Sequence, residues 1–103
     1  MVKPQKLYLM ENTAKLNKIG VAINPTRRQR QLELASGMKI DIIKCWTTLD
    51  DTAYNVEQYL HRMYARRRLE GEWFTNISIP DVEYAGYELI ECNHDGSDKR
   101  IIE

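Results

Sequence analysis

The sequence predicts a single α+β domain, and three observations support that prediction. Two short segments in which apolar and polar residues alternate are joined by turn residues, which is typical of a β-hairpin. A later run rich in β-branched residues predicts a third strand, and segments with apolar residues at helical spacing lie around it. A chain of 103 residues is long enough for one modest hydrophobic core and too short for two domains.

The hairpin is predicted from residues 5–12 and 18–23. Both segments alternate with the period of a strand, and the NTAKLN sequence between them has turn residues at each end. One face of this hairpin is apolar and carries Leu7, Leu9, Ile19 and Val21. Tyr8 and Lys18 then emerge together on the opposite face, which makes them candidate site residues.

The first helix is predicted to follow the hairpin, with Asn24 as its N-cap, Pro25 at its first position and Gly37 just past its end. Arg28 shares an inward helix face with Leu32, which lies four residues later. A charged side chain on an inward face costs desolvation energy unless a partner or a site explains it. Arg28 is therefore a candidate site residue.

A third strand is predicted over residues 38–49, and a long helix from Asp50 to about Arg68. On this helix Glu57 and His61 lie four residues apart, which places them one turn from each other on the same stripe. They are either a surface pair or a carboxylate and an imidazole positioned for chemistry.

The last third of the chain predicts a short extended segment that carries Trp73 and Phe74 into the core, followed by a helix over residues 79–92. Glu72 is either an acid close to the site or an ion-pair partner. The remaining residues contain a D-G turn and predict either an added strand or a loose tail. The predicted boundaries are 5–92 for the domain and 93–103 for the tail.

Charge is distributed unevenly along a chain whose net charge is zero. Residues 1–68 carry 13 Lys and Arg against 6 Asp and Glu, whereas residues 69–103 carry 2 against 9. This split favours a basic working face and a nucleic-acid partner. No apolar stretch approaches the roughly 20 residues of a membrane span, and the two isolated cysteines offer no zinc motif, so we expect a cytoplasmic protein without a membrane partner.

Five sequence elements occur in an order that resembles the GIY-YIG nuclease superfamily. They are LYLM (7–10), KIG (18–20), Arg28, EQYLH (57–61) and GEWF (71–74). Together they are most similar to the phage-type branch of small DNA-binding domains, over roughly residues 5–79. The resemblance implies a central three-stranded antiparallel sheet flanked by helices, and a protein of phage or mobile-element origin that works in the host cytoplasm.

The resemblance also implies roles for individual residues. Tyr8 matches the tyrosine of the first motif, Lys18 takes the place of the second tyrosine, Arg28 matches the catalytic arginine, and Glu57 matches the glutamate that binds Mg²⁺ or Mn²⁺. Leu32 stands where family nucleases often have His or Tyr, and His61 would supply an imidazole instead. Arginine suits the nonbridging phosphate oxygens, whereas a tyrosine with a pKa near about 10 needs cations nearby to act as a base.

Six further arginines are candidate contacts to the DNA backbone: Arg27, Arg30, Arg62, Arg66, Arg67 and Arg68. The alternative for Arg27 and Arg30 is a solvated helix face, and for the other four it is a favourable interaction with a helix C-terminus.

The predicted function is a metal-dependent DNA endonuclease. Two alternatives remain open: a DNA-binding module of the same fold that does not cut, and a factor that acts on a host nuclease or repair complex through the acidic C-terminal part. Recognition of a long DNA site by so small a domain would require a homodimer or a host protein partner.

Overall fold

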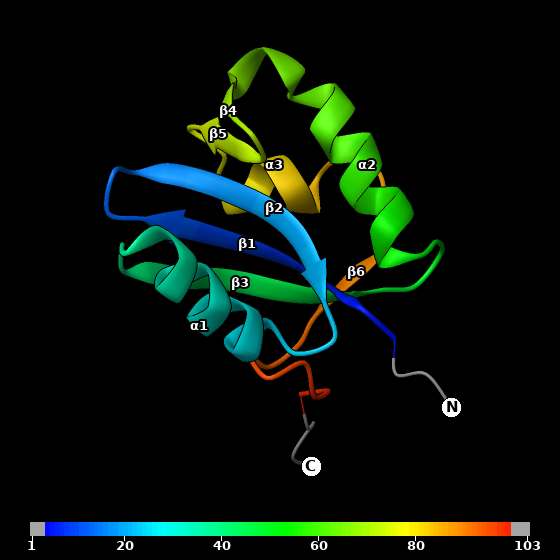
Figure 1. The fold of residues 1–103 in the computed structure, drawn as a ribbon. Helices are drawn as coiled ribbons and strands as arrows, with labels where there is room; N and C mark the ends of the chain where they lie inside the picture. Colours follow the sequence, from blue (N-terminus) through cyan, green and yellow to red (C-terminus); the bar gives the residue numbers. More distant parts are fainter. Residues whose placement is uncertain (1–3, 100–103) are drawn as a thin grey trace.

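Residues 4–99 are described by a computed structural model, and they form one compact α+β domain with helices on both faces of a sheet (Figure 1). Within these residues the sheet has six strands: β1 (Lys6–Asn12), β2 (Leu16–Ala22), β3 (Ile40–Thr48), β4 (Arg68–Glu70), β5 (Trp73–Thr75) and β6 (Leu89–Glu91). The strand order is β4-β5-β2-β1-β3-β6, and each neighbouring pair is antiparallel. The helices are α1 (Pro25–Ser36), α2 (Ala53–Met63) and α3 (Ile79–Glu83), with a 3-10 turn, η1 (Ala65–Arg67), after α2.

The prediction of a three-stranded sheet was wrong in its strand count. The three predicted strands are present as β1, β2 and β3 at the centre of the described sheet, but three further strands extend it at both edges. Each added strand is only three residues long, which is too short to show an alternating pattern in the sequence.

Two predicted helices were too long. The helix expected to reach about Arg68 ends at Met63, and the residues after it form η1 and β4. The helix expected over residues 79–92 ends at Glu83, and its last part is strand β6. Gly86 keeps the helix from continuing to residue 92, because its φ of 107° lies outside helical geometry and favours glycine.

The hairpin faces are as predicted. Leu7, Leu9 and Ile19 are fully buried in one cluster with side chains of α2 and α3, and Val21 packs against that cluster. Tyr8 and Met10 lie in a second cluster, on the face that α1 covers with Leu32. Because Tyr8 pairs with Gly20 and Met10 pairs with Lys18, the side chains of Tyr8 and Lys18 share the α1 face of the sheet.

The described part of the predicted tail packs against the beginning of α1. The carbonyl of His94 accepts hydrogen bonds from the backbone N–H of Thr26 at 2.9 Å and from its hydroxyl at 2.9 Å. Asp98 forms an isolated antiparallel bridge with Cys92. None of the helices in this part of the chain has the length and hydrophobicity of a membrane span. The tail residues from 100 onward lie outside the described residues.

Candidate nucleic-acid site around Tyr8 and Gly20

The candidate site is built around a close approach between Tyr8 and Gly20. These two residues are cross-strand partners on β1 and β2. A Cβ atom placed on Gly20 would lie 2.3 Å from the Tyr8 hydroxyl oxygen, which is far inside van der Waals contact. The missing side chain therefore lets the Tyr8 ring lie across β2. Glycine inside a strand often marks such a close approach, and this signal could have placed Gly20 in the predicted site.

Arg28 of α1 lies beside the Tyr8 hydroxyl, while the carboxylates of Glu72 and Glu57 lie within electrostatic range of it. Burial raises the pKa of Tyr8 to about 12; the two carboxylates add to the rise and Arg28 opposes it. The nearby cation Arg28 does lower this pKa, but burial outweighs it. The hydroxyl stays protonated near neutral pH, and it can donate a hydrogen bond but cannot act as a base in this state.

Lys18 is a buried cation, with 4% of the residue exposed. Its ammonium group forms an ion pair with Glu72 and lies 5.9 Å from the centre of the Trp73 ring. The hydrogen bond from Lys18 lowers the pKa of Glu72, and the nearby Arg28 and His61 side chains lower it further. Of the two alternatives for Glu72, the ion-pair partner is the one observed, and that ion pair lies inside the candidate site.

Glu57 and His61 reach the site from α2. The Ile19 carbonyl accepts a hydrogen bond from His61 Nε2 at 2.7 Å, which leaves Nδ1 as the other ring nitrogen available for hydrogen bonding. The His61 ring also packs against Phe74, with ring centres 5.1 Å apart. Glu57 is 6% exposed, and within residues 4–99 its carboxylate accepts one hydrogen bond, from Gln58 Nε2 at 2.7 Å. The surface-pair alternative for these two residues is therefore wrong, because both are buried.

The five predicted site residues come together from β1, β2, α1 and α2, and Glu72 of the β4–β5 turn joins them. Within residues 4–99 there is no group of three or more His, Cys, Asp or Glu side chains placed to hold a metal ion together. A single carboxylate such as Glu57 fits Mg²⁺ only in the mode where water and substrate phosphate complete its coordination. The donor set is compatible with that mode.

The six predicted DNA-contact arginines do not share one environment. Arg27 and Arg30 are exposed on α1, and Arg62, Arg66 and Arg68 are exposed near the end of α2 and after it. Arg67 differs because its guanidinium donates to the carbonyl of Asn76 at 3.2 Å and to the carboxylate of Asp81 at 3.3 Å.

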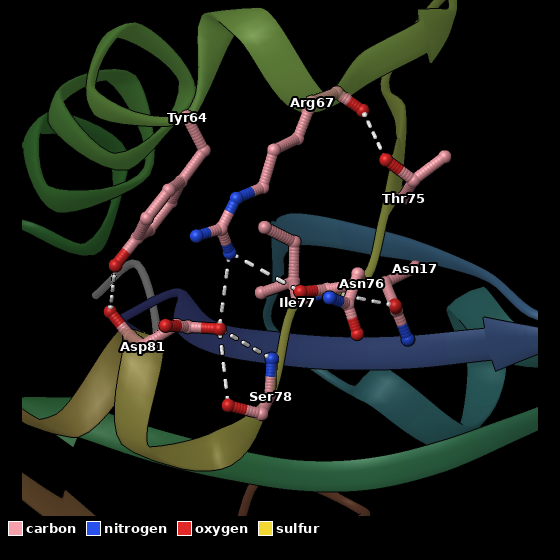
Figure 2. A network of polar contacts seen from close by, with 8 residues as sticks. All are labelled: Asn17, Tyr64, Arg67, Thr75, Asn76, Ile77, Ser78 and Asp81. Atoms are coloured by element: carbon pink, nitrogen blue, oxygen red, sulfur yellow. Dashed lines mark hydrogen bonds and ion pairs between the residues drawn. The ribbon is translucent and has the colours of Figure 1, made fainter.

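The contacts of Arg67 belong to a polar network that connects the end of α2 with α3 (Figure 2). In this network the carboxylate of Asp81 also accepts hydrogen bonds from the N–H and hydroxyl of Ser78, which caps α3. The Tyr64 hydroxyl donates to the Asp81 carbonyl at 2.7 Å. Arg67 therefore has a structural role that its position in a basic run did not predict.

Folding also pairs the two oppositely charged parts of the sequence. Among the described residues, five ion pairs join residues 1–68 to residues 69–99: Lys6–Asp98, Lys18–Glu72, Lys44–Glu83, Lys44–Glu91 and Arg67–Asp81. The uneven charge along the chain is thus partly cancelled in three dimensions, and it does not by itself define a basic face.

Comparison with known families corrects the family predicted from the sequence. The T5orf172 domain matches residues 6–91, whereas the GIY-YIG family gives no match. The assignment to the GIY-YIG superfamily was therefore wrong, because T5orf172 is a different domain family. Searches of curated proteins and of solved structures found no match. T5orf172 domains are a phage-associated, nuclease-like family of DNA-binding domains, and the match over most of the chain shows that this protein belongs to the T5orf172 domain family.

Proposed function

We propose that the protein binds DNA at the Tyr8–Gly20 site and hydrolyses a phosphodiester bond there with the help of Mg²⁺ or Mn²⁺. One observation carries this proposal: four functional groups converge around Gly20, which has no side chain. They are the protonated hydroxyl of Tyr8, the cations Lys18 and Arg28, and the buried carboxylate of Glu57. The hydroxyl and the two cations can donate hydrogen bonds to a phosphate group, and the carboxylate suits a divalent cation. Membership of a DNA-associated family supports DNA as the source of the phosphate.

Each side chain has a distinct part in this proposal. Arg28 holds two nonbridging phosphate oxygens through its planar fork, and its interaction strengthens as negative charge develops on them. Tyr8 donates a hydrogen bond to a phosphate oxygen, since its raised pKa keeps the proton in place. His61 is fixed by the Ile19 carbonyl and presents Nδ1, which can take a proton.

Glu57 would hold the metal ion, whose chemistry is to neutralise phosphate charge and to make bound water more acidic. Its buried carboxylate has a hydrogen bond from Gln58 that orients it, as metal-binding carboxylates commonly have.

The test is a cleavage assay on supercoiled, linear and single-stranded DNA with Mg²⁺, with Mn²⁺ and with EDTA. We expect metal-dependent cleavage by the natural protein. Glu57→Gln should lower the rate by orders of magnitude and leave DNA affinity unchanged or higher, because one negative charge near the phosphate is removed. The matched control is Glu88→Gln. Glu88 is an exposed glutamate next to β6, which is the edge strand at the other end of the sheet from β4 and β5. Equal cleavage by the Glu57 and Glu88 variants would contradict the role given to Glu57.

A second candidate is a DNA-binding module that does not cut. The raised pKa of Tyr8 favours it, because a protonated tyrosine cannot activate water. DNA binding that depends on Arg28, without cleavage in any metal, would support this candidate. A partner-binding role for the acidic C-terminal part has less support, since five of its carboxylates pair within the domain: Glu72, Asp81, Glu83, Glu91 and Asp98.

A further inference from the structure

The ion pair between Lys18 and Glu72 joins a buried group to an exposed one. The Lys18 side chain is 5% exposed, whereas the Glu72 side chain is 53% exposed. Among the described residues, Glu72 is the one ion-pair and hydrogen-bond partner of the Lys18 ammonium. A buried ammonium without a counter-ion is costly, so an anion is required at this position.

Glu72 is also surrounded by the other groups that a phosphate would use. The guanidinium of Arg28 and the ring of His61 lie within electrostatic range of its carboxylate, in addition to the ammonium of Lys18. The Tyr8 hydroxyl lies within electrostatic range of the same carboxylate. The carboxylate of Glu72 thus holds the place of an anion among groups that would bind one phosphate.

The two partners differ in how firmly the fold holds them. Lys18 lies on β2, where it pairs with Met10 on one side and Trp73 on the other. Glu72 lies in the turn between β4 and β5, next to Gly71, whose φ is 56°. Strand β4 is at the edge of the described sheet, and all three of its residues are exposed. Glu72 can therefore turn away from Lys18 without exposing the hydrophobic core.

We propose that Glu72 is an internal substitute for substrate phosphate: it neutralises Lys18 in the free protein, and a DNA phosphate displaces it and takes over the contact. This inference rests on the proposed function, because that function supplies the DNA phosphate. It adds that binding is an exchange of one anion for another at Lys18. Breaking the Lys18–Glu72 pair then costs free energy on binding, and this cost weakens the DNA affinity.

The test measures DNA binding by fluorescence anisotropy in EDTA, so that the result does not depend on cleavage. Glu72→Gln should bind a short DNA duplex about two- to fivefold more tightly, the range expected when one partly exposed ion pair no longer has to be broken. The matched control is Glu70→Gln, because Glu70 is an exposed glutamate in the same hairpin and has no ion pair among the described residues. It should change the affinity much less.

Two further variants test whether the effect acts through Lys18. In Lys18→Met the buried cation is gone, so adding Glu72→Gln to it should give no further gain in affinity. Glu72→Asp shortens the carboxylate and weakens the pair, and it should give a smaller gain. Glu72→Asp also provides the test if Glu72→Gln does not fold. Equal gains in the Glu70 and Glu72 variants, or weaker DNA binding by Glu72→Gln, would overturn the proposal.

Thermal unfolding separates this proposal from the proposed function. Glu72→Gln should unfold at a lower temperature than the natural protein in sodium chloride, because Lys18 loses its counter-ion. Sodium phosphate at equal ionic strength should recover more of that loss in Glu72→Gln than in Glu70→Gln. If the natural protein binds no DNA while phosphate still stabilises Glu72→Gln selectively, the proposed function fails, and the exchange at Lys18 stands only for free phosphate as the incoming anion. If phosphate stabilises Glu72→Gln no more than Glu70→Gln, and Glu72→Gln binds DNA as the natural protein does, the proposed exchange is wrong.

Discussion

The hydroxyl of Tyr8 lies over Gly20, in the space that any larger residue at position 20 would fill. Because the two residues are also cross-strand partners, the register of β1 and β2 fixes this contact. The Tyr8–Gly20 contact therefore lies between the two central strands of the described sheet.

Gly20→Ala should destabilise the protein by about 1–3 kcal/mol, the usual cost of forcing extra atoms into a packed region. The new Cβ would lie 2.3 Å from the Tyr8 oxygen, and the ring would have to move. Denaturant unfolding measures the loss. The same substitution made in a Tyr8→Leu background should cost much less, because the colliding atoms are gone. An equal cost in both backgrounds would show that the contact with Tyr8 is not the cause.

Tyr8 should also make stability depend on alkaline pH. Burial raises the pKa of Tyr8 to about 12 in the folded protein, and in the unfolded chain the pKa is about 10. This raised pKa contributes stability that is fully present below the unfolded pKa and is lost as the pH rises through the folded one. The natural protein should therefore lose up to about 2–3 kcal/mol more than Tyr8→Phe across this window. Parallel pH profiles of the two unfolding free energies would contradict the raised pKa.

The central fold was predictable because its signals are local. Asn24 caps α1 by accepting a hydrogen bond from the N–H of Arg27 at 3.1 Å, and Gly37 ends the helix with a φ of 71°, as the sequence indicated. The edge strands were not predictable in this way. A strand of three residues exists because of the strand beside it, and that partner is not visible in the local pattern.

The candidate site was likewise predictable only where its signals are local. Tyr8 and Lys18 were placed on one face by alternation alone, and the register confirms it. The ion pair of Lys18 joins residues 54 positions apart, so alternation could not choose between the alternatives for Glu72. The direction of the Tyr8 pKa shift depends on burial by α1, which the sequence does not show. Short motifs of this kind also led to the wrong family, since the family that matches the chain is the T5orf172 domain.

Exposed and paired arginines after α2 should behave differently when they are removed. Arg62→Ala and Arg66→Ala remove exposed charges, so each should flatten the salt dependence of DNA binding by nearly one unit if it contacts a phosphate. Arg67→Ala should leave that slope nearly unchanged and lower stability by about 1 kcal/mol, because it breaks a partly exposed contact with Asp81. Binding curves at several salt concentrations and denaturant unfolding provide the two readouts. A slope change for Arg67 equal to that for Arg66 would contradict its structural role.

Arg28 should matter more for cleavage than for binding, because its contact with the phosphate strengthens as charge develops on the oxygens. Removing such a preorganised donor typically costs about 2.7–4 kcal/mol in the reaction barrier. Arg28→Ala should therefore slow cleavage by about 100- to 1,000-fold at saturating DNA. Arg28→Lys keeps the charge and loses the planar fork, so it should restore binding more than cleavage. Lys39→Ala removes an exposed charge that follows α1 and is the matched control, with an unchanged cleavage rate. If Arg28→Lys cleaves as fast as the natural protein, charge alone is sufficient and the two-oxygen contact is wrong.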